Sequence, residues 1–411
     1  MNTLSKSREL FKERARKALT KKSTYGPDID LEPYIRKHLE SSSLETLNIR
    51  DPKIQTRLES VGVDVSETGR SGSYYQVDWK IISYYSRIPG VKVLTLEDAL
   101  ENYWDVIKDY FWKAIPVDRD KYTATVELYG RGGYVILVDD GVKVENPIQT
   151  CLLMYTRNIL QAPHNIIVLG DNAELHVITG CTFLKEPSGI HLSVSEFYVG
   201  KGSKLTFTMI HGWGLQQHIR PRTGVIVEDE GEFISHYIVL SPPGTLQTYP
   251  TVKLRGRDSK AYISSVSVGL NTSIMDIGAE IILEGRRSIG EIVSRSLGRD
   301  KSTITARSRI VGLGRESKGH IECMGLLLSD SAVIEAVPQL SAQTDDVELT
   351  HEASIGRIAE DEIYYLMSKG FTYEEAKSII VRGFMSIEVK GIPKTLRNMI
   401  ENVINIVSSK L

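Results

Sequence analysis

The first part of the chain has its apolar residues at helical spacing. In the stretch 95–115 they recur every three or four residues, which places them on one face of a helix: Leu96, Leu100, Tyr103, Ile107 and Tyr110. Thr95, with Asp98 three residues later, supplies the capping chemistry that begins such a helix. The stretches 4–19 and 30–41 also read as helices. We therefore expect a helical N-terminal region over residues 1–118.

From residue 119 the pattern changes to short alternating strands separated by turns. The turns follow one another at steps of 30, 30, 29, 28, 28 and 29 residues, at Asp140-Gly141, Gly170-Asp171, Gly200-Lys201, Asp229-Glu230, Arg257-Asp258, Gly285-Arg286 and Gly314-Arg315. A strand-rich repeat that cannot bury its own apolar face is typical of coils stacked on one another. The constant period predicts a parallel β-helix over residues 119–354. A β-sandwich is the alternative, although nothing in a sandwich requires a constant period.

Helical signals return after residue 354. The stretch 358–370 ends at Gly370, and the next begins with Thr372 and Glu375, which are spaced as a capping box. Pro393 then begins a third helix with one apolar stripe, which consists of Leu396, Met399, Val403 and Ile406. We expect a helical domain over residues 355–411 that covers the last coil and leaves surfaces free for a partner protein.

Composition excludes several classes of function. The 411 residues carry 50 Lys and Arg against 52 Asp and Glu, a formal charge of -2, so we expect neither nucleic acid nor a membrane surface as a partner. No apolar run approaches the ~20 residues that a membrane span needs, and the first 22 residues lack the apolar core of a secretory signal. Three widely spaced cysteines favour a reducing compartment. We expect a cytoplasmic protein.

The coil period makes the spacing of reactive residues informative, because residues one period apart lie ~4.8 Å apart on neighbouring strands. Cys151, Cys181 and His211 are separated by 30 and 30 residues, which predicts one column. Cys323 and Glu352 are separated by 29, which predicts a thiol beside a carboxylate. Thiolates and imidazoles bind iron, and an activated thiolate accepts sulfur. The alternative is that each cysteine is a small buried apolar side chain.

Strand alternation separates two further candidates, His351 and Glu352, because successive side chains point to opposite faces. With Glu352 assigned to the face of Cys323, we expect His351 to serve a dimer interface. Cys181 and Cys323 are 142 residues apart, about five coils or roughly 24 Å. They therefore cannot bind one cluster within one chain, and would act in sequence, with sulfur passing through the coil interior. We expect Trp213 to be a packing residue.

Two motifs are missing from the sequence. It contains no G-x-x-x-x-G-K-[ST] phosphate loop, so we expect no ATP hydrolysis by this chain. It also contains no C-x-x-C pair, which argues against a permanent all-cysteine cluster or zinc site.

Four segments resemble the SufB/SufD family. The stretch "THEASIGRIAEDEIYYLMSKGFTYEEAKSIIVRGF" is similar to the C-terminal signature of that family, and "DYFWKAIPVDRDKYTATVELYGRGGYVILVDDGVKVENPIQ", "VITGCTF" and "IECMGLLLSD" resemble SufB. The resemblance runs from about Asp109 to Phe384. It implies a right-handed parallel β-helix between helical terminal domains, a dimer with itself or with a SufB/SufD paralogue, and an ATPase partner, SufC, bound by the C-terminal helices.

The resemblance also implies roles for individual residues. Cys181 matches the sulfur acceptor of SufB, and Cys323 and Glu352 match residues implicated in assembling the cluster. His351 matches the histidine that SufD keeps. The stretch "VPQLSAQTDD" resembles SufD instead, so the chain combines features of both. We expect a scaffold rather than an enzyme, which takes sulfur from a donor protein, holds a transient iron-sulfur cluster with Cys323, Glu352 and His351 as iron ligands, and passes it to apo acceptor proteins.

Two other functions remain open on the sequence alone. A SufD-like accessory subunit would hold no cluster of its own and would need a separate SufB. A β-helix carbohydrate-active enzyme would share the architecture, but such enzymes are usually exported and use clustered acids, and neither feature is evident. The sequence also leaves open the cluster type, the sulfur donor and whether a flavin takes part.

Overall fold

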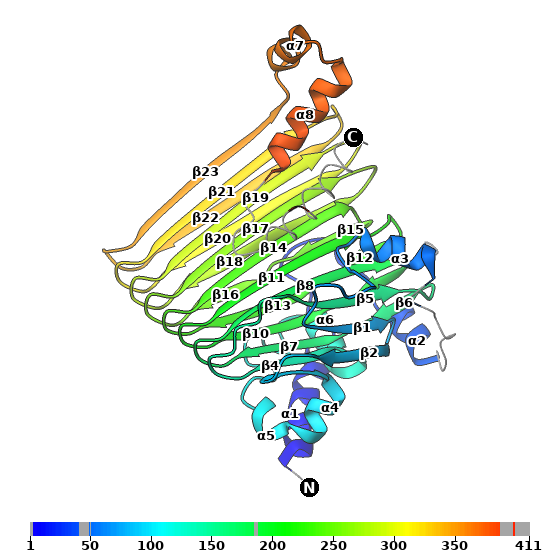
Figure 1. Ribbon diagram of the computed structural model, residues 1–411, viewed down its shortest axis with the longest axis vertical. Coiled ribbons are helices and arrows are strands. Elements are labelled where there is room, and N and C mark those ends of the chain that lie inside the picture. The colour runs from blue at the N-terminus through cyan, green and yellow to red at the C-terminus, as the bar shows by residue number, and fades with distance from the viewer. Residues whose placement is uncertain (1–2, 41–48, 50, 185–187, 387–397, 399–411) are drawn as a thin grey trace.

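The computed structural model describes residues 3–40, 49, 51–184, 188–386 and 398. It is a parallel β-helix with helices at both ends of the chain (Figure 1), as the repeat period predicted. Two long sheets run along the coil and enclose one apolar interior. No helix in the described part of the chain is both long and apolar enough to cross a membrane.

The first sheet is parallel from β1 onward, and neighbouring strands pair residue to residue. Its order in space is β2 (Lys80–Ser86), β1 (Gly72–Val77), β5 (Ile148–Met154), β8 (Glu174–Phe183), β11 (Lys204–Gly212), β14 (Glu232–Ser241), β17 (Lys260–Gly269), β19 (Ile289–Gly298), β21 (Lys318–Leu327) and β23 (Glu348–Arg357).

The second sheet forms the opposite wall of the coil. Its main row is β3 (Val91–Thr95), β4 (Tyr134–Val138), β7 (His164–Leu169), β10 (Val194–Val199), β13 (Arg222–Val227), β16 (Thr251–Leu254), β18 (Ile274–Leu283), β20 (Thr303–Gly312) and β22 (Val333–Ala342). A second row of short strands joins it at β18: β6 (Ile159–Gln161), β9 (Gly189–His191), β12 (Gln217–Ile219) and β15 (Thr245–Thr248).

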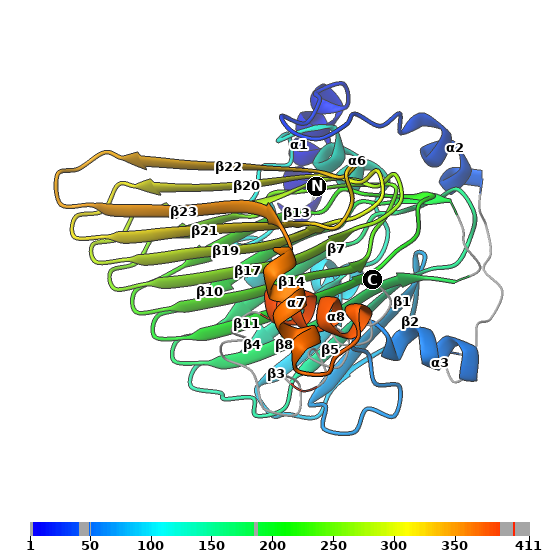
Figure 2. The same ribbon diagram turned by 90° about the horizontal axis from the view of Figure 1, so that it is seen from above.

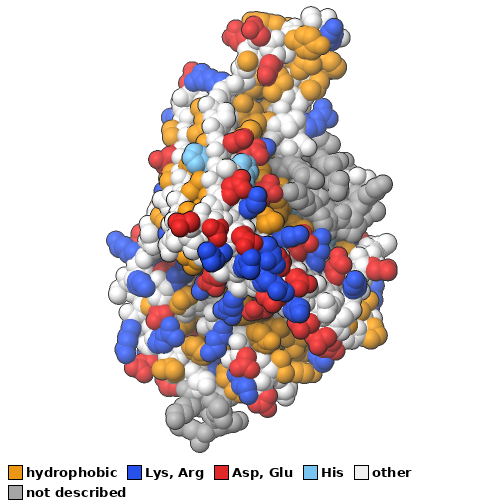
Figure 3. Space-filling view, turned by 90° about the vertical axis from the view of Figure 1, so that its left-hand side faces the viewer, with side chains coloured by type: hydrophobic (Ala, Val, Ile, Leu, Met, Phe, Trp, Pro, Cys, Tyr) orange, Lys and Arg blue, Asp and Glu red, His pale blue; other side chains and the backbone are white. Residues whose placement is uncertain are grey.

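The turns between the two sheets stack on one another, and this stacking explains the regular period. The carboxylate of Asp140 accepts a hydrogen bond from the backbone N–H of Asp171 (2.7 Å), and that of Asp171 accepts one from Lys201 (2.9 Å). Most of these turns also contain a residue in the left-handed region, such as Glu230 (φ 57°), a conformation that costs little only in a tight turn. Figure 3 shows acidic and basic side chains intermingled over this edge of the coil.

The N-terminal part contains helices α1 (Thr3–Ala18), α2 (Glu32–Glu40), α3 (Pro52–Glu59), α4 (Leu96–Asn102) and α5 (Trp104–Ile107), and α6 (Lys121–Tyr129) follows. The structure differs from the expected helical region 1–118 in two respects. Strands β1, β2 and β3 lie within it, with β2 antiparallel to β1 and β3 antiparallel to β4. The single helix expected over 95–115 is two short helices, although Thr95 caps the first as predicted (Asp98 N–H to Thr95 Oγ1, 3.0 Å).

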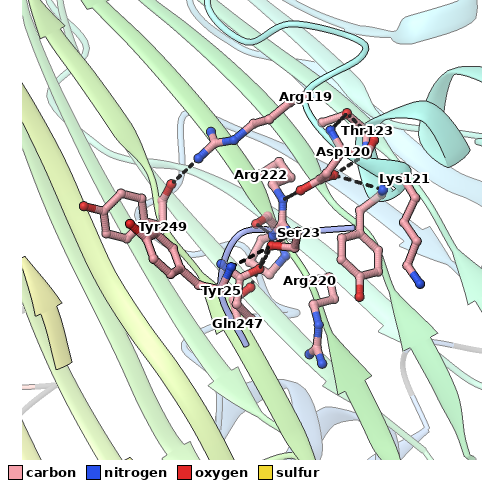
Figure 4. Close-up of polar contacts among 12 residues, drawn as sticks. Ser23, Tyr25, Arg119, Asp120, Lys121, Thr123, Arg220, Arg222, Gln247 and Tyr249 are labelled. Carbon is pink, nitrogen blue, oxygen red and sulfur yellow. Dashed lines mark hydrogen bonds and ion pairs between the residues drawn. The ribbon is translucent and has the colours of Figure 1, made fainter. Parts of the chain in front are cut away.

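A buried polar cluster attaches the segment before α2 to the coil (Figure 4). Nε of Arg222 donates to the carboxylate of Asp120 at 2.7 Å, and the same guanidinium reaches Ser23 Oγ at 3.2 Å. Asp120 also caps α6 by accepting from the backbone N–H groups of Tyr122 and Thr123. One carboxylate thus links the N-terminal segment, α6 and β13.

Two C-terminal helices follow the last strand, α7 (Glu360–Ser368) and α8 (Tyr373–Met385). Gly370 (φ 99°) ends α7, and Thr372 and Glu375 form the predicted capping box of α8. Val381 and Met385 of α8 pack on the outer face of the first sheet. The expectation that the C-terminal helices cover the last coil is wrong for α7 and α8, which lie beside it (Figure 2). The helix expected from Pro393 lies outside the described residues.

Candidate functional site

Residues of the first sheet form columns inside the coil because each strand pairs in register with the next. One inward column ends in three isoleucines and a histidine: Ile263, Ile292, Ile321 and His351. The column beside it consists of Thr179, Met209, Tyr237, Ser265, Ser294, Cys323 and Ala353. Cys323 and His351 therefore face the same interior, one coil apart.

Cys323 lies on β21 and is 2% exposed. Its Sγ is 3.7 Å from Oγ of Ser308 on the opposite wall. Burial raises the pKa of the Cys323 thiol, and the Ser308 hydroxyl partly opposes this effect. The thiol is therefore protonated at neutral pH, and a positive charge such as iron would be needed to hold it as the thiolate.

The structure corrects the predicted position of Glu352. Cys323 pairs with Ala353, and Glu352 pairs with Glu322 on the outer face of the sheet. The expectation that Glu352 stacks on Cys323 is therefore wrong, and so is the assignment of His351 to the opposite face from Cys323. Glu322 is in turn paired with Arg295 at 2.5 Å, so Glu352 extends a charged outer row rather than an interior one.

Cys181 is completely buried in the interior, and His211 is its direct neighbour on the next strand, as predicted. Burial, and then the nearby Cys151 thiol, raise the pKa of Cys181 well above its ordinary value. Cys151 is not in this column, contrary to the prediction. It pairs with Gly180 and belongs to the apolar cluster on the outer face of the sheet, with Leu58 and Val61. Burial raises the pKa of Cys151 to about 12.

An enclosed cavity of about 40 Å³ lies inside the coil between the two inward cysteines. Its lining includes four successive members of the Cys323 column, Met209, Tyr237, Ser265 and Ser294, together with Ser308. Met209 lies two residues before His211, and Ser294 pairs with Cys323. Cys181 and Cys323 are five strands apart in the sheet, as the spacing predicted, which is ~24 Å.

The last coil, β22 and β23, is open to solvent. Its inward positions continue the apolar interior, yet Leu349 is only half-buried and His351 and Ile355 are exposed. Strands β22 and β23 are also the last in their sheets, so each has one edge without a neighbouring strand among the described residues. Figure 2 looks onto this end of the coil. His351 is therefore accessible there, while Cys323 lies one coil deeper.

Helices α7 and α8 carry an exposed apolar surface beside this end. Five large side chains between 39% and 63% exposed contribute to it: Tyr364, Tyr365, Met367, Phe371 and Tyr373. Apolar patches of this kind on a soluble protein are typical of a surface that binds another protein.

Comparison with known proteins identifies the family. The model of the SUF system FeS cluster assembly SufBD core domain matches residues 152–384, and that of the SufBD protein N-terminal region matches residues 72–150. The chain belongs to the SufBD family. It is 43% identical over 391 residues to an iron-sulfur cluster assembly SufBD family protein of Methanothermobacter thermautotrophicus, which covers 93% of this chain and 95% of that one.

Two further relatives of this SufBD protein extend the comparison. A SufBD family protein of Archaeoglobus fulgidus is 43% identical over 356 residues, covering 86% of this chain and 95% of the relative. The iron-sulfur cluster assembly protein SufB of Bacillus subtilis is 28% identical over 311 residues, covering 74% and 66%. The resemblance inferred from the sequence is confirmed, and the chain is an iron-sulfur cluster assembly protein.

The candidate ligands of the SufBD chain do not converge within one copy. Among the described residues, no three His, Cys, Asp or Glu side chains lie close enough together to hold a metal ion. Cys323 and His351 share a face, Glu352 points outward, and Cys181 is five strands away. An iron site that uses these residues therefore needs rearrangement of the last coil or ligands from a second chain.

The sequence reasoning missed part of the interior beside Cys181. His191 and Gln161 are completely buried there and hydrogen-bonded to each other, and Trp213, expected only to pack, donates its indole N–H to His211 at 2.6 Å. A signal was present, because Gln161 and His191 are 30 residues apart, one coil period.

Proposed function

We propose that this SufBD protein is the cytoplasmic scaffold on which an iron-sulfur cluster is assembled, with Cys181 receiving sulfur and Cys323 binding the nascent cluster. The observation that carries the proposal is the interior arrangement of the two thiols. Both face the same interior, and a cavity lined by small and polar side chains lies between them. Sulfur accepted at Cys181 passes along this column to Cys323.

The open last coil supports a cluster site shared between two chains. His351 is the terminal inward residue of its column and is exposed at that end. When a second SufBD chain, a copy or a paralogue, docks there through the free edges of β22 and β23, His351 of each copy lies at the seam. Cys323 and His351 are then the interior iron ligands. Glu352, on the outer face, contributes a carboxylate for incoming iron.

The ATPase SufC is the proposed partner of α7 and α8. The exposed tyrosines of α7 and the neighbouring Phe371 supply the apolar surface that a second protein would bury. ATP hydrolysis belongs to that partner, and it drives the rearrangement of the last coil that gives iron access to Cys323. A double substitution, Tyr364→Glu with Tyr365→Glu, is expected to abolish co-purification with SufC without changing the fold measured by circular dichroism.

Anaerobic reconstitution with ferrous iron and sulfide tests the cluster assignment. The wild-type chain is expected to develop the visible absorption of an iron-sulfur cluster, and Cys323→Ser is expected to lose it. Cys151→Ser is the matched control, because Cys151 is equally buried but lies on the outer face of the sheet. Undiminished absorption in Cys323→Ser would refute the role of Cys323.

A SufD-like accessory role is the second candidate. It is favoured by the lack of convergence of three metal-binding side chains among the described residues of one chain. Reconstitution of the isolated homodimer separates the two functions. A cluster that forms only when a SufB paralogue is added would support the accessory role.

A further inference from the structure

A buried chamber beside Cys181 contains two histidines that face each other across Trp213. His191 follows Cys181 in the same coil, and His211 and Trp213 belong to the next coil. The Trp213 ring centroid is 5.5 Å from that of His191 and 5.9 Å from that of His211. All four side chains are at most 1% exposed, so water does not supply their missing hydrogen bonds.

Hydrogen bonding fixes the proton of His211 on Nε2. The indole N–H of Trp213 can only donate, and it donates to Nδ1 of His211 at 2.6 Å. Nδ1 must therefore be the unprotonated nitrogen of the neutral ring. Nε2–H is a donor, and it has no partner among the described residues.

Hydrogen bonding fixes the proton of His191 on the opposite nitrogen. The side-chain amide N–H groups of Gln161 donate to the backbone carbonyls of Asp78 (3.1 Å) and Leu153 (3.0 Å). The Gln161 carbonyl oxygen is therefore the atom 2.8 Å from Nδ1 of His191, which must donate to it. Nε2 of His191 is an acceptor, and within the described part of the chain nothing donates to it.

Burial keeps both rings neutral. It lowers the pKa of His191 to about 3, and it lowers the pKa of His211 well below its ordinary value, with the nearby His191 adding to the effect. The chamber thus presents one orphan donor and one orphan acceptor. Leaving buried polar groups unpaired is costly, so the pair indicates a bound group that both accepts and donates a hydrogen bond.

We propose that the chamber holds a sulfane sulfur as a persulfide on Cys181, whose terminal sulfur accepts from Nε2–H of His211 and donates its proton to Nε2 of His191. Cys181 and His211 are paired residues on adjacent strands, both inward-facing. This inference rests on the proposed role of Cys181 as sulfur acceptor. His211 and His191 are sulfur-binding residues that retain the cargo before it moves along the cavity.

The loading step needs no oxidant or reductant. The sulfur arrives on a donor persulfide, R–S–SH. A bond forms between Sγ of Cys181 and the sulfane sulfur while the S–S bond of the donor breaks. The thiol proton of Cys181 moves to Nε2 of His191 and then to the departing sulfur, which leaves as R–SH, and the persulfide keeps the remaining proton.

The test measures how long Cys181 retains sulfane sulfur. The full-length chain, with Cys151→Ser and Cys323→Ser so that Cys181 is its only cysteine, is loaded anaerobically with inorganic polysulfide. The added sulfur is detected by intact-protein mass, and its removal by cyanide is timed. His211→Leu removes the donor, and His211→Gln retains an N–H donor. His176→Gln is the matched control, because His176 is buried on the same strand as Cys181 but faces outward with its own partner, Thr208.

We expect His211→Leu to lose the sulfur about tenfold faster than the parent, the effect of one lost hydrogen bond to a partly charged group. His211→Gln and His176→Gln are expected to match the parent. Where His211→Leu does not fold, Trp213→Phe replaces it, because loss of the indole donor frees the His211 tautomer and is expected to shorten retention. Equal retention in every variant would overturn the histidine assignment and leave the role of Cys181 standing. Absence of persulfide on Cys181 in the parent would overturn both.

Discussion

Replacement of Asp120 by asparagine is expected to destabilise the chain through the buried charge of Arg222. The side chains of Arg222 and Asp120 are 2% and 5% exposed, and Arg119 and Arg220 lie nearby in the same cluster (Figure 4). Asparagine keeps an oxygen that caps α6 but leaves Arg222 without its counter-charge. Breaking a buried ion pair in this way costs ~3–5 kcal/mol. Asp120→Ala also removes the cap and costs about 1 kcal/mol more.

The expected shift in melting temperature follows from the size of the chain. An unfolding entropy of about 2.1 cal/mol/K per residue gives ~0.9 kcal/mol/K for 411 residues. Asp120→Asn is therefore expected to lower the apparent Tm by ~4–6 °C, measured by thermal circular dichroism. Combining it with Arg222→Met, which removes the unpaired charge, is expected to recover more than half of the loss.

The ion pair between Arg14 and Asp118 provides the control. It has a similar distance, 2.7 Å, but its side chains are 42% and 39% exposed. Water and salt screen such a pair, so Asp118→Asn is expected to change the Tm by no more than about 1 °C. Equal shifts for Asp118→Asn and Asp120→Asn would refute the reasoning, because burial is the main difference between the two pairs.

Three further outcomes are expected. Burial lowers the pKa of His176 to about 3, so below about pH 6.5 the unfolded chain takes up a proton that the folded chain refuses; His176→Gln is expected to reduce the acid loss of stability by up to ~1.4 kcal/mol per pH unit, measured by urea unfolding. Burial raises the pKa of Cys151 to about 12, so the folded chain loses stability from about pH 9 to about pH 12, and Cys151→Ala is expected to lack that component. Thr372→Ala removes the cap of α8 and is expected to speed hydrogen exchange in its first turn about fivefold.

The period of the β-helix could be predicted from the sequence because the turns are under a local constraint. Each turn stacks on the previous one and needs residues such as Asp171 that bond the next coil. Strands β1 and β2 were missed, although the apolar runs around Asp78 contained a hairpin signal. Asp78 adopts a left-handed conformation (φ 51°) between them, a position that Asp tolerates better than most residues.

The two errors in the candidate site have one physical cause. The coils differ in length by a residue, and a shift of one residue moves a side chain to the other face of a strand. Cys151 and Cys181 are 30 residues apart, but the register at that coil is 29; Cys323 and Glu352 are 29 apart, but the register there is 30. Sequence spacing therefore located each residue on the correct coil, and only the structure could assign its face.

The two ends of the coil differ in a way that limits the size of any assembly. A β-helix with two open ends could add copies indefinitely, as a fibre does. Here the first coil carries the antiparallel strands β2 and β3 at its edge, with α1, α4 and α5 beside it (Figure 1), and only the β22 and β23 end is open. A chain with one open end can join one neighbour through it, and growth then stops. The antiparallel first strands are thus a chain terminator for polymerisation, and they restrict end-to-end association to pairs.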